Sequence, residues 1–186
     1  MKRCFDFIIS ILLLAILSPL LIITAISIKM TSKGSLLFRQ QRVGKNGKLF
    51  SVYKFRTMID KVRSFDQQTF NDDAEVTAVG KIIRRLKIDE LPQLLNVVKG
   101  DMSLIGPRPC LPALVKDFNE SGRKRLLVRP GLTGLAQVNG NIYLTWEQRW
   151  EFDRKYVESQ SLGLDLKIIS KTVLILMFGE KWGKKI

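Results

Sequence analysis

Two adjacent carboxylates, Asp89 and Glu90, stand in the segment RRLKIDELP at 84–92. Proline is tolerated in the first turn of a helix, so Pro92 predicts that the pair lies at a helix start. Free N–H groups and the positive end of the helix dipole favour carboxylates there, and equally a phosphate brought beside them. One carboxylate could attack phosphorus while the other holds Mg²⁺, which neutralises phosphate charge. Such a pair is more often a simple cap, so this segment alone leaves both interpretations open.

Cations that could bind phosphate occur at several other points. In Pro107-Arg108-Pro109, two fixed φ angles restrict where the planar guanidinium of Arg108 can point, and that suits a phosphate. Lys54 and Arg56 are predicted to share one face of a strand, and Arg129 opens a glycine-rich segment. Taken singly, each of these cations is more often a solvated surface charge or part of a turn.

Composition narrows the chemistry further. The chain contains no histidine, which removes the commonest general base and the commonest zinc ligand. Its two cysteines, Cys4 and Cys110, show no metal-ligand spacing. Catalysis must therefore rest on carboxylates, Lys, Arg, Tyr or a hard metal ion. The formal net charge of +14 suits anionic partners: nucleic acid, lipid headgroups or phosphate-bearing substrates.

An uncharged apolar segment, residues 7–28, precedes all of these groups. As a straight helix it would be about 33 Å long, at roughly 1.5 Å per residue, enough to cross a hydrocarbon core of about 30 Å. Ser18-Pro19 interrupts the segment, and a proline without an N–H bends a helix. Two arms of about 17 Å each could then dip into one leaflet and return.

The flanking charges favour this return. Lys2 and Arg3 precede the segment, and it is followed by Lys29, Lys33, Arg39, Arg42, Lys45 and Lys48. Positive residues prefer the cytoplasmic side, and a re-entrant hairpin over residues 1–30 places both flanks there. A single spanning anchor, a buried core helix and a cleaved signal peptide are the alternatives. A signal peptide needs a small-residue cleavage site, for which residues 29–33 are poorly suited.

Residues 31–186 have the length of one modest domain. The pattern predicts strands at 36–43 and 49–57, a mobile loop at 60–75, helices at 78–86, 91–98, 146–158 and 164–178, an amphipathic stretch at 111–127, and a glycine-rich loop at 129–141 that approaches a ligand closely. The last helix is too short to span a membrane, so residues at about 162–178 are expected to lie on its surface. The predicted fold is α/β or α+β: a mostly helical, membrane-associated domain with a small strand element and interfacial amphipathic helices.

Taken in order, these segments resemble the motifs of a known family. The matching stretches are Lys2-Arg3 with Phe5-Asp6, Ser18-Pro19, YKFRTM at 53–58, IDELPQL at 88–94, KGDMS at 99–103, GPRP at 106–109 and RPGLTGLAQVNG at 129–140. On these residues nearly the whole chain resembles a small phosphoglycosyl transferase of the monotopic class, the bacterial sugar transferase family. So many ordered matches favour a functional role for Asp89 and Glu90 over a capping role.

The resemblance implies a reaction. A family member moves the sugar-1-phosphate of a UDP-sugar onto a polyprenol phosphate, such as undecaprenyl phosphate, and releases UMP. By similarity, Asp89 would attack the β-phosphorus to form a covalent phosphosugar-aspartyl intermediate, and Glu90 would help to bind Mg²⁺. The implied location is the bacterial inner membrane, with the catalytic domain on the cytoplasmic face. The implied use is the first membrane step of a cell-surface glycan such as an O-antigen, capsule or exopolysaccharide.

The resemblance also suggests which residues bind substrate. Carried over by position, the candidates are Arg84, Arg108 and Arg129 for phosphate, with Lys54 and Gln137 beside them. Asn141 stands where many relatives have arginine, so no sugar contact is expected there. Cys110 stands where an aliphatic residue is common and is expected to fill space in the core. Family members of this small size tend to take N-acetylated amino sugars, which we expect here over a plain hexose.

Two other functions compete with the enzyme. A basic module that tethers nucleic acid to the membrane would need stacking aromatics and would not need Asp89. Trp146 and Trp150 are more typical of packing or interface anchors, so we expect no nucleic-acid partner. A degenerate family member that acts as a scaffold would not need the intact Asp89-Glu90 pair. The expected partners are the UDP-sugar, the polyprenol phosphate, membrane lipid and downstream glycosyltransferases of the same glycan.

Overall fold

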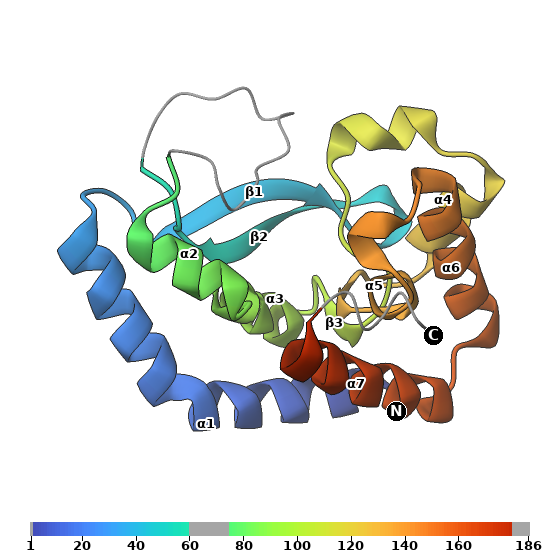
Figure 1. The fold of residues 1–186 in the computed structure, drawn as a ribbon. Coiled ribbons are helices and arrows are strands. Elements are labelled where there is room, and N and C mark those ends of the chain that lie inside the picture. Colours follow the sequence, from blue (N-terminus) through green and yellow to red (C-terminus); the bar gives the residue numbers. More distant parts are fainter. Residues whose placement is uncertain (1, 60–74, 180–186) are drawn as a thin grey trace.

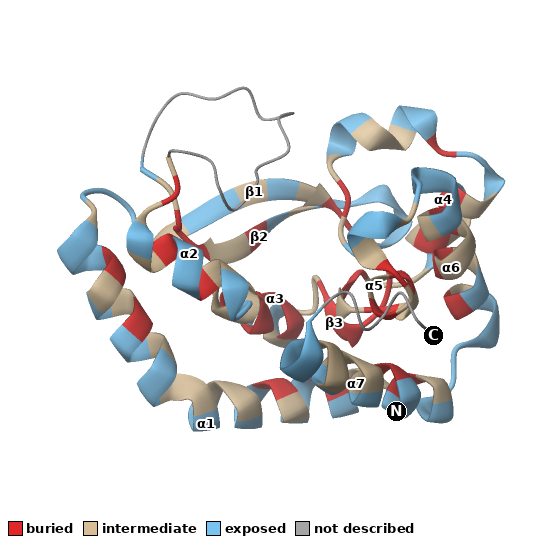
Figure 2. Cartoon of the chain, viewed as in Figure 1, coloured by how far each residue is buried: buried red, intermediate tan, exposed pale blue. Residues whose placement is uncertain are grey.

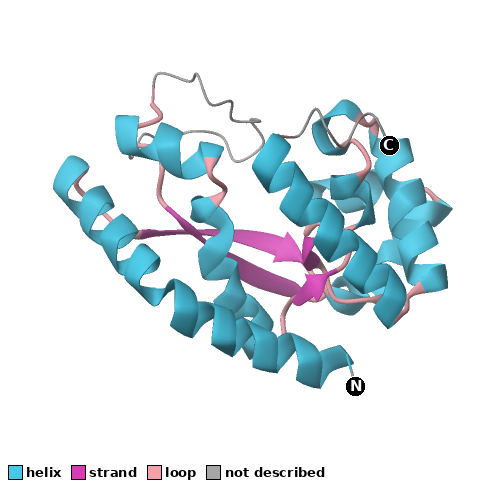
Figure 3. Ribbon diagram, turned by 60° about the horizontal axis from the view of Figure 1, so that its bottom comes forward, coloured by secondary structure: helices cyan, strands magenta, loops and turns pink. Residues whose placement is uncertain are grey.

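The computed structural model describes residues 2–59 and 75–179. Two small sheets of two strands each lie among the helices (Figures 1 and 3). This arrangement confirms the predicted fold, a mostly helical domain with a small strand element. The loop expected at 60–75 lies, except for Glu75, outside the described residues.

The chain forms short elements after one long N-terminal helix. In order, they are α1 (Lys2–Thr31), β1 (Leu37–Val43), β2 (Leu49–Phe55), α2 (Ala78–Arg85), the 3₁₀ helix η2 (Ile88–Gln93), α3 (Leu94–Lys99), β3 (Ser103–Ile105), η3 (Pro112–Asp117), α4 (Glu120–Lys124), η4 (Arg125–Leu127), β4 (Gly131–Thr133), α5 (Leu135–Val138), α6 (Trp146–Ser159) and α7 (Leu162–Phe178). Strands β1 and β2 pair antiparallel, with Gln40 opposite Val52, whereas β3 and β4 pair parallel. The amphipathic stretch at 111–127 is split into η3, α4 and η4, because Phe118 and Asn119 adopt extended backbone between the pieces.

Helix α1 bends near its middle, where Pro19 lies (Figure 1). Pro19 has no N–H, so the carbonyl of Ala15, four residues earlier, loses its usual helical donor. The hydroxyl of Ser18 donates to that carbonyl instead, at 2.8 Å. The Ser18-Pro19 pair therefore bends the helix while satisfying the carbonyl that the proline leaves without a partner.

The surface of α1 is mostly apolar and uncovered (Figure 2). By length and composition this helix could cross a membrane, and it is the only such helix among the described residues. Only 11% of its most apolar window is buried within the protein. A core helix would be mostly covered, so that alternative is wrong, and another apolar medium must cover residues such as Ile16 and Ile23.

The first turns of α1 are tied to the domain by charged side chains. Lys2 Nζ lies 2.6 Å from the Asp165 carboxylate at the start of α7. Asp6 is buried and accepts from the Ser103 hydroxyl of β3 at 2.7 Å. Arg3 donates to the carbonyls of Val97 and Val98 near the C-terminus of α3, where a cation complements the helix dipole.

The end of α1 is held by a different residue. Arg56 directly follows β2, is buried, and donates to the backbone carbonyls of Ser32 at 2.9 Å and Lys33 at 2.6 Å. Strand β2 ends at Phe55, one residue before Arg56, whose N–H still donates to the carbonyl of Leu36 at 3.0 Å. The Arg56 side chain satisfies carbonyls just beyond the end of α1, and its sharing of a strand face with Lys54 stays a prediction. Both ends of α1 are consequently attached to the same folded domain.

The main core lies between β2, α3, β3, α6 and α7. Its fully buried members include Val52, Leu94, Val97, Met102, Ile105, Tyr156 and Ile168. Asn96 is also fully buried; its side chain accepts from the N–H of Tyr53 at 3.0 Å and donates to the carbonyl of Ser51 at 2.8 Å. This amide ties α3 to β2 and so sets the distance between the segments that carry Glu90 and Lys54.

Three glycines allow β3 and the glycine-rich segment to approach each other. A Cβ added to Gly131 would lie 2.1 Å from the backbone nitrogen of Gly106, and one added to Gly134 would lie 2.1 Å from the Gly106 carbonyl oxygen. Gly131 and Gly134 thus approach the backbone of the chain itself, and the close approach of this segment to a ligand stays a prediction. They are needed because no side chain fits between these two backbones.

This packing predicts a difference between two Gly→Ala variants. Gly131→Ala should lower the free energy of unfolding by about 1–3 kcal/mol, because the added methyl group overlaps backbone that cannot move aside. Gly163→Ala in α7 meets nothing within 4 Å and should be neutral or stabilising by up to about 1 kcal/mol. Thermal unfolding in detergent measures the stability change of each variant. Equal melting temperatures for Gly131→Ala and Gly163→Ala would contradict the close approach of the two backbones.

Candidate active site

Asp89 and Glu90 occupy the first turn of η2, directly after a sharp change in chain direction. Helix α2 ends at Arg85, and Lys87 then adopts the left-handed conformation with φ 57°. A residue with a side chain pays conformational energy of about 1–2 kcal/mol there. Such strain persists only where the surroundings enforce it, and it is often found at functional sites. The turn brings the two predicted carboxylates against β2.

Glu90 is held between two cations from distant parts of the sequence. Lys54 Nζ on β2 lies 2.7 Å from Glu90 Oε1. Arg108 binds the same carboxylate with both terminal nitrogens, at 2.6 Å from Oε1 and 3.3 Å from Oε2. Burial alone would raise the pKa of Glu90, but Arg108 and Lys54 outweigh it and hold the pKa well below its usual range. Glu90 is therefore a permanently charged, fixed group.

Asp89 has a different environment. Within residues 2–59 and 75–179 its carboxylate accepts no hydrogen bond, although the charges of Lys54, Arg84 and Lys87 act on it. Burial raises its pKa, the negative charge of Glu90 raises it further, and the three cations oppose both effects. A carboxylate that is more basic than usual and not engaged in a hydrogen bond is suited to nucleophilic attack on an electrophile such as phosphorus.

The structure brings three predicted cations to this pair. Lys54 and Arg108 contact Glu90 directly, and Arg84 donates from Nε to the Thr57 hydroxyl at 2.8 Å while its charge acts on Asp89. The side chain of Arg108 is 48% exposed, so its guanidinium could contact a ligand as well as Glu90. These cations would counterbalance a diphosphate beside Asp89.

Two other predicted substrate-binding residues have partners elsewhere. Arg129 donates from Nε to the carbonyl of Gly100, beyond the C-terminus of α3, at 2.8 Å. Gln137 lies on α5, where its amide nitrogen is 3.5 Å from the carbonyl of Leu132 and its buried Oε1 has no hydrogen-bond partner within the described part of the chain. Neither is among the groups that shift the pKa of Asp89 or Glu90. Their roles in substrate binding stay predictions.

Sequence reasoning missed other residues that shape the site. Arg42 on β1 lies near Arg108 and Glu90, and mainly burial lowers its pKa to about 10. Lys87 sits in the strained turn beside Asp89. Lys87 could have been predicted as a site residue from its position two residues before Asp89. No sequence pattern indicated a site role for Arg42, because Arg42 comes close to Glu90 only through the contact of β1 with the segment after Arg108.

The two carboxylates are compatible with a magnesium ion but could not enclose one. Among the described residues, no three His, Cys, Asp or Glu side chains form a cluster that could hold a metal. Mg²⁺ typically binds through one or two carboxylates, water and substrate phosphates. In the part of the chain that the structure describes, Glu90 Oε2 accepts a single long hydrogen bond, from Arg108 at 3.3 Å. Glu90 could therefore bind the ion through this oxygen, with a diphosphate substrate and water as the other ligands.

A comparison with known families agrees with these motifs. The family described as bacterial sugar transferase matches residues 1–179. The chain belongs to this family. Membership makes it an enzyme of the sugar transferase class, and it confirms the resemblance drawn from the motif order.

Several curated relatives cover most of the chain. The sugar transferase EpsL of Bacillus subtilis is 42% identical over 97% of this chain and 89% of its own length. A UDP-glucose:undecaprenyl-phosphate glucose-1-phosphate transferase of Caulobacter vibrioides is 44% identical over 95% of the chain and 69% of the relative. A UDP-N-acetylgalactosamine-undecaprenyl-phosphate N-acetylgalactosaminephosphotransferase of Aeromonas hydrophila is 41% identical over 96% of the chain, which spans 44% of that relative. Relatives of this family therefore include enzymes named for a hexose and for an N-acetylated amino sugar.

The charges around Asp89 predict a change in pH dependence. Glu90→Gln removes the neighbouring negative charge that raises the pKa of Asp89, while Lys54, Arg84 and Lys87, which lower it, remain; the pKa of Asp89 should therefore fall. Because the ionised carboxylate is the reactive form, the acidic limb of the pH profile of kcat/KM should move to lower pH in the residual activity of this variant.

The matched control is Glu120→Gln, which removes an exposed carboxylate on α4. This variant should keep the profile of the unmodified enzyme. An acidic limb in Glu90→Gln that stays in place or moves to higher pH would show that Asp89 does not control it.

Proposed function

We propose that this enzyme transfers a sugar-1-phosphate from a UDP-sugar to undecaprenyl phosphate, or a similar polyprenol phosphate, through a covalent intermediate on Asp89. The observation that carries the proposal is the contrast between the two carboxylates. Glu90 is bound by two cations, whereas Asp89 beside it accepts no hydrogen bond in the described part of the chain and has a raised pKa. The names of the glucose and N-acetylgalactosamine relatives support the donor and acceptor classes.

In the first step, an oxygen of Asp89 attacks the β-phosphorus of the donor. The new bond forms as the bond from this phosphorus to the bridging oxygen breaks, and UMP leaves with that oxygen. Arg108 and Arg84 would bind the non-bridging oxygens, where negative charge must be stabilised. Lys54 keeps Glu90 ionised and in place at 2.7 Å. The product on the enzyme is a mixed anhydride of the Asp89 carboxylate and the sugar phosphate.

In the second step, a phosphate oxygen of the polyprenol phosphate attacks the same phosphorus, and the Asp89 carboxylate leaves unchanged. The product is a polyprenyl-diphosphate-sugar. Because both steps use one phosphorus position, the same cations serve both, and donor and acceptor need not be bound together. No histidine is required, since the nucleophile is an ionised carboxylate.

Mg²⁺ is part of this proposal. When bound, the ion would neutralise diphosphate charge, and Glu90 is the residue that we propose as its ligand. An N-acetylated amino sugar is our expected donor, in preference to glucose. The product would begin the assembly of a cell-surface glycan such as an exopolysaccharide.

We also propose that α1 enters and leaves the membrane on the cytoplasmic side of the inner membrane. A helix that spans the bilayer separates its ends by about 30 Å across the hydrocarbon core. Here Lys2 at one end pairs with Asp165, and Arg56 binds carbonyls at the other end, all within one domain. A bent helix that stays in one leaflet is compatible with both attachments, and the lipid acceptor is then delivered on the side of the catalytic domain.

Helix α7 supports the same placement. Its apolar residues Leu162, Leu166, Val173, Leu176 and Met177 are exposed, whereas Asp165 and Ile168 are buried against the domain. The exposed residues recur at the spacing of one helical face. A helix of this length with an uncovered apolar face is suited to lie in the membrane interface beside α1.

The chemical proposal predicts that Asp89→Asn releases UMP at least about three orders of magnitude more slowly than the unmodified enzyme. The substitution removes the nucleophile while preserving shape. Purified enzyme in nanodiscs would receive Mg²⁺, undecaprenyl phosphate and a panel of UDP-glucose, UDP-N-acetylglucosamine and UDP-N-acetylgalactosamine, with release of UMP measured for each.

Intact-mass analysis without acceptor should reveal a phosphosugar adduct on the unmodified enzyme and none on Asp89→Asn. Glu120→Gln should behave as the unmodified enzyme. UMP release by Asp89→Asn at the normal rate would refute the covalent mechanism, and the preferred sugar in the panel decides between hexose and amino sugar.

The membrane proposal predicts that both flanks of α1 are accessible from one side. In a Cys4→Ser background, one cysteine is added before Met1 and another replaces the exposed Lys45, while Cys110 remains because it is buried. An impermeant maleimide should label neither site in intact spheroplasts and both after permeabilisation. Labelling of one site alone before permeabilisation would establish a spanning helix instead.

A further inference from the structure

The segment that carries Arg108 is held by its carbonyl groups. Pro107 and Pro109 have no N–H, so this stretch has few donors with which to fix its backbone. The carbonyl of Pro107 accepts from the N–H of Gly131 at 2.9 Å, and that of Cys110 accepts from the N–H of Val43 at 3.0 Å. The carbonyl of Arg108 itself accepts from a side chain, the guanidinium of Arg125.

Arg125 also forms a buried ion pair. Its Nε lies 3.1 Å from the Asp153 carboxylate on α6, and the two residues are 6% and 2% exposed. The planar guanidinium thus binds Asp153 with one nitrogen and the Arg108 carbonyl with another, which a lysine could not do with the same geometry. The ring of Phe118 packs against it, with its centroid 5.5 Å from the Arg125 guanidinium carbon.

Stability alone gives little reason for this pair. Replacing a buried ion pair by apolar residues of similar volume is often neutral or stabilising, because the desolvation of both charges offsets their attraction. Burial raises the pKa of Asp153 to about 6, although Arg125 and Arg149 oppose the shift. The desolvation of Asp153 is therefore large. What the pair provides is a donor, fixed in direction, at the backbone carbonyl of Arg108.

We propose that the buried Arg125–Asp153 pair is a positioning unit for Arg108, which it aims at Glu90 and at the diphosphate of the donor. Arg108 has a long, half-exposed side chain, and ordering such a side chain costs up to about 2 kcal/mol of rotamer freedom. Anchoring its backbone restricts the region that the guanidinium can reach. Contacts link Asp153 on α6 to Arg125, to Arg108 and to Glu90. This inference rests on the proposed function, in which Arg108 binds donor phosphate.

The test replaces the pair by apolar residues of similar size, Arg125→Met with Asp153→Leu. The melting temperature should change by no more than a few degrees, because the core stays filled and no charge is left unpaired. The kcat/KM for the UDP-sugar should fall by about 10–100-fold, mostly through a higher KM, since small displacements of a binding group have effects of this size.

A cycle with Arg108→Ala separates positioning from a general structural role. If the pair acts through Arg108, its replacement in the Arg108→Ala background should cause no further loss of kcat/KM. A general loosening of the fold would lower the activity of both backgrounds by the same factor. If the apolar pair variant does not fold, Arg125→Lys and Asp153→Asn replace it, each measured with and without Arg108→Ala. A loss of kcat/KM that disappears in the Arg108→Ala background again supports positioning.

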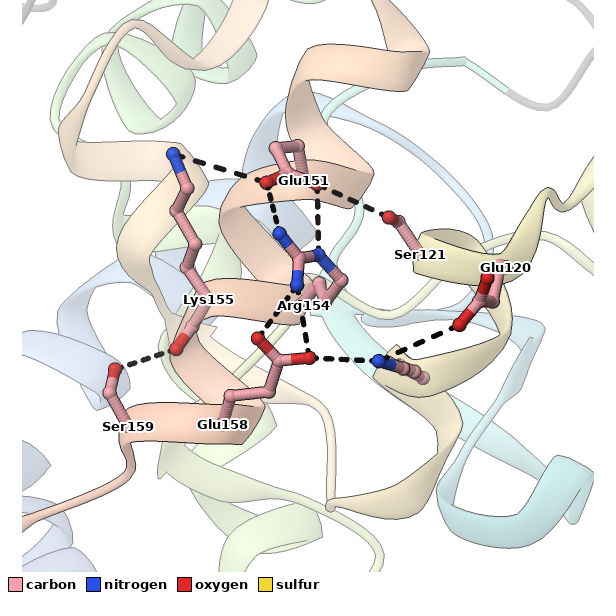
Figure 4. Close-up of polar contacts among 8 residues, drawn as sticks. Glu120, Ser121, Glu151, Arg154, Lys155, Glu158 and Ser159 are labelled. Atoms are coloured by element: carbon pink, nitrogen blue, oxygen red, sulfur yellow. Dashed lines mark hydrogen bonds and ion pairs between the residues drawn. The ribbon is translucent and has the colours of Figure 1, made fainter.

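The same helix α6 offers a matched control. Arg154 lies between Glu151 and Glu158 (Figure 4). Its Nε is 3.0 Å from the Glu151 carboxylate, and its Nη1 is 2.8 Å from the Glu158 carboxylate. These groups are partly exposed, and no contact joins them to Arg108 within the described residues. Arg154→Gln with Glu158→Gln removes an ion pair of similar geometry from the surface and should leave kcat/KM unchanged, since exposed pairs contribute little.

The positioning role and the proposed function fail on different results. The positioning role is overturned if the folded pair variant keeps the wild-type kcat/KM, or if kcat/KM falls by the same factor with and without Arg108. An unmodified enzyme that releases no UMP would refute the proposed function instead. Titration of UDP binding by calorimetry through the same cycle would then still show whether the pair acts through Arg108.

Discussion

The site depends on one carboxylate held between two cations. The Glu90 side chain is only 16% exposed, and a charge largely removed from water is unstable without partners. Its partners, Lys54 on β2 and Arg108 between two prolines, come from segments 36 residues before it and 18 residues after it. Their ion pairs with Glu90 draw a hairpin, a 3₁₀ helix and a proline-bounded loop to one point. Asp89 is left beside them without a hydrogen bond from the described residues, and the positive charges of Lys54, Arg84 and Lys87 act on the same place, where they would suit a phosphate.

Charged side chains also determine how α1 is attached to the domain. Apolar side chains such as Leu13 and Leu21 pack α1 on the domain, and charged side chains fix its two ends. Lys2, Arg3 and Asp6 bind one side of the domain, and Arg56 binds the carbonyls that follow Thr31. Between these ends Ser18 compensates for Pro19. The middle of α1 is thus free to meet lipid, while its ends stay fixed near the groups that handle phosphate.

Local rules predicted the local structure well. The helices at 78–86, 146–158 and 164–178, the hairpin strands and the bend at Pro19 were all predicted within a few residues, because each depends on periodicity, turns or a proline. Two contacts lay beyond what local patterns could predict. The Arg56 side chain binds carbonyls just beyond the end of α1, and Gly131 and Gly134 make room for the backbone of Gly106. Neither partner is close in sequence, so no local pattern could name it.

The sequence by itself determined the class of chemistry. A chain without histidine, with adjacent carboxylates, many cations and an interrupted apolar helix, is compatible with phosphate chemistry at a membrane, and the ordered motifs then indicated the family and its reaction. Only the tertiary structure decided how the two carboxylates differ. Adjacent residues with nearly equal intrinsic pKa values become a fixed, charged Glu90 and a more basic Asp89, because burial and the placement of Lys54 and Arg108 act on them unequally. The same is true of Arg125 and Asp153, whose contact with Arg108 exists only once α6 has packed.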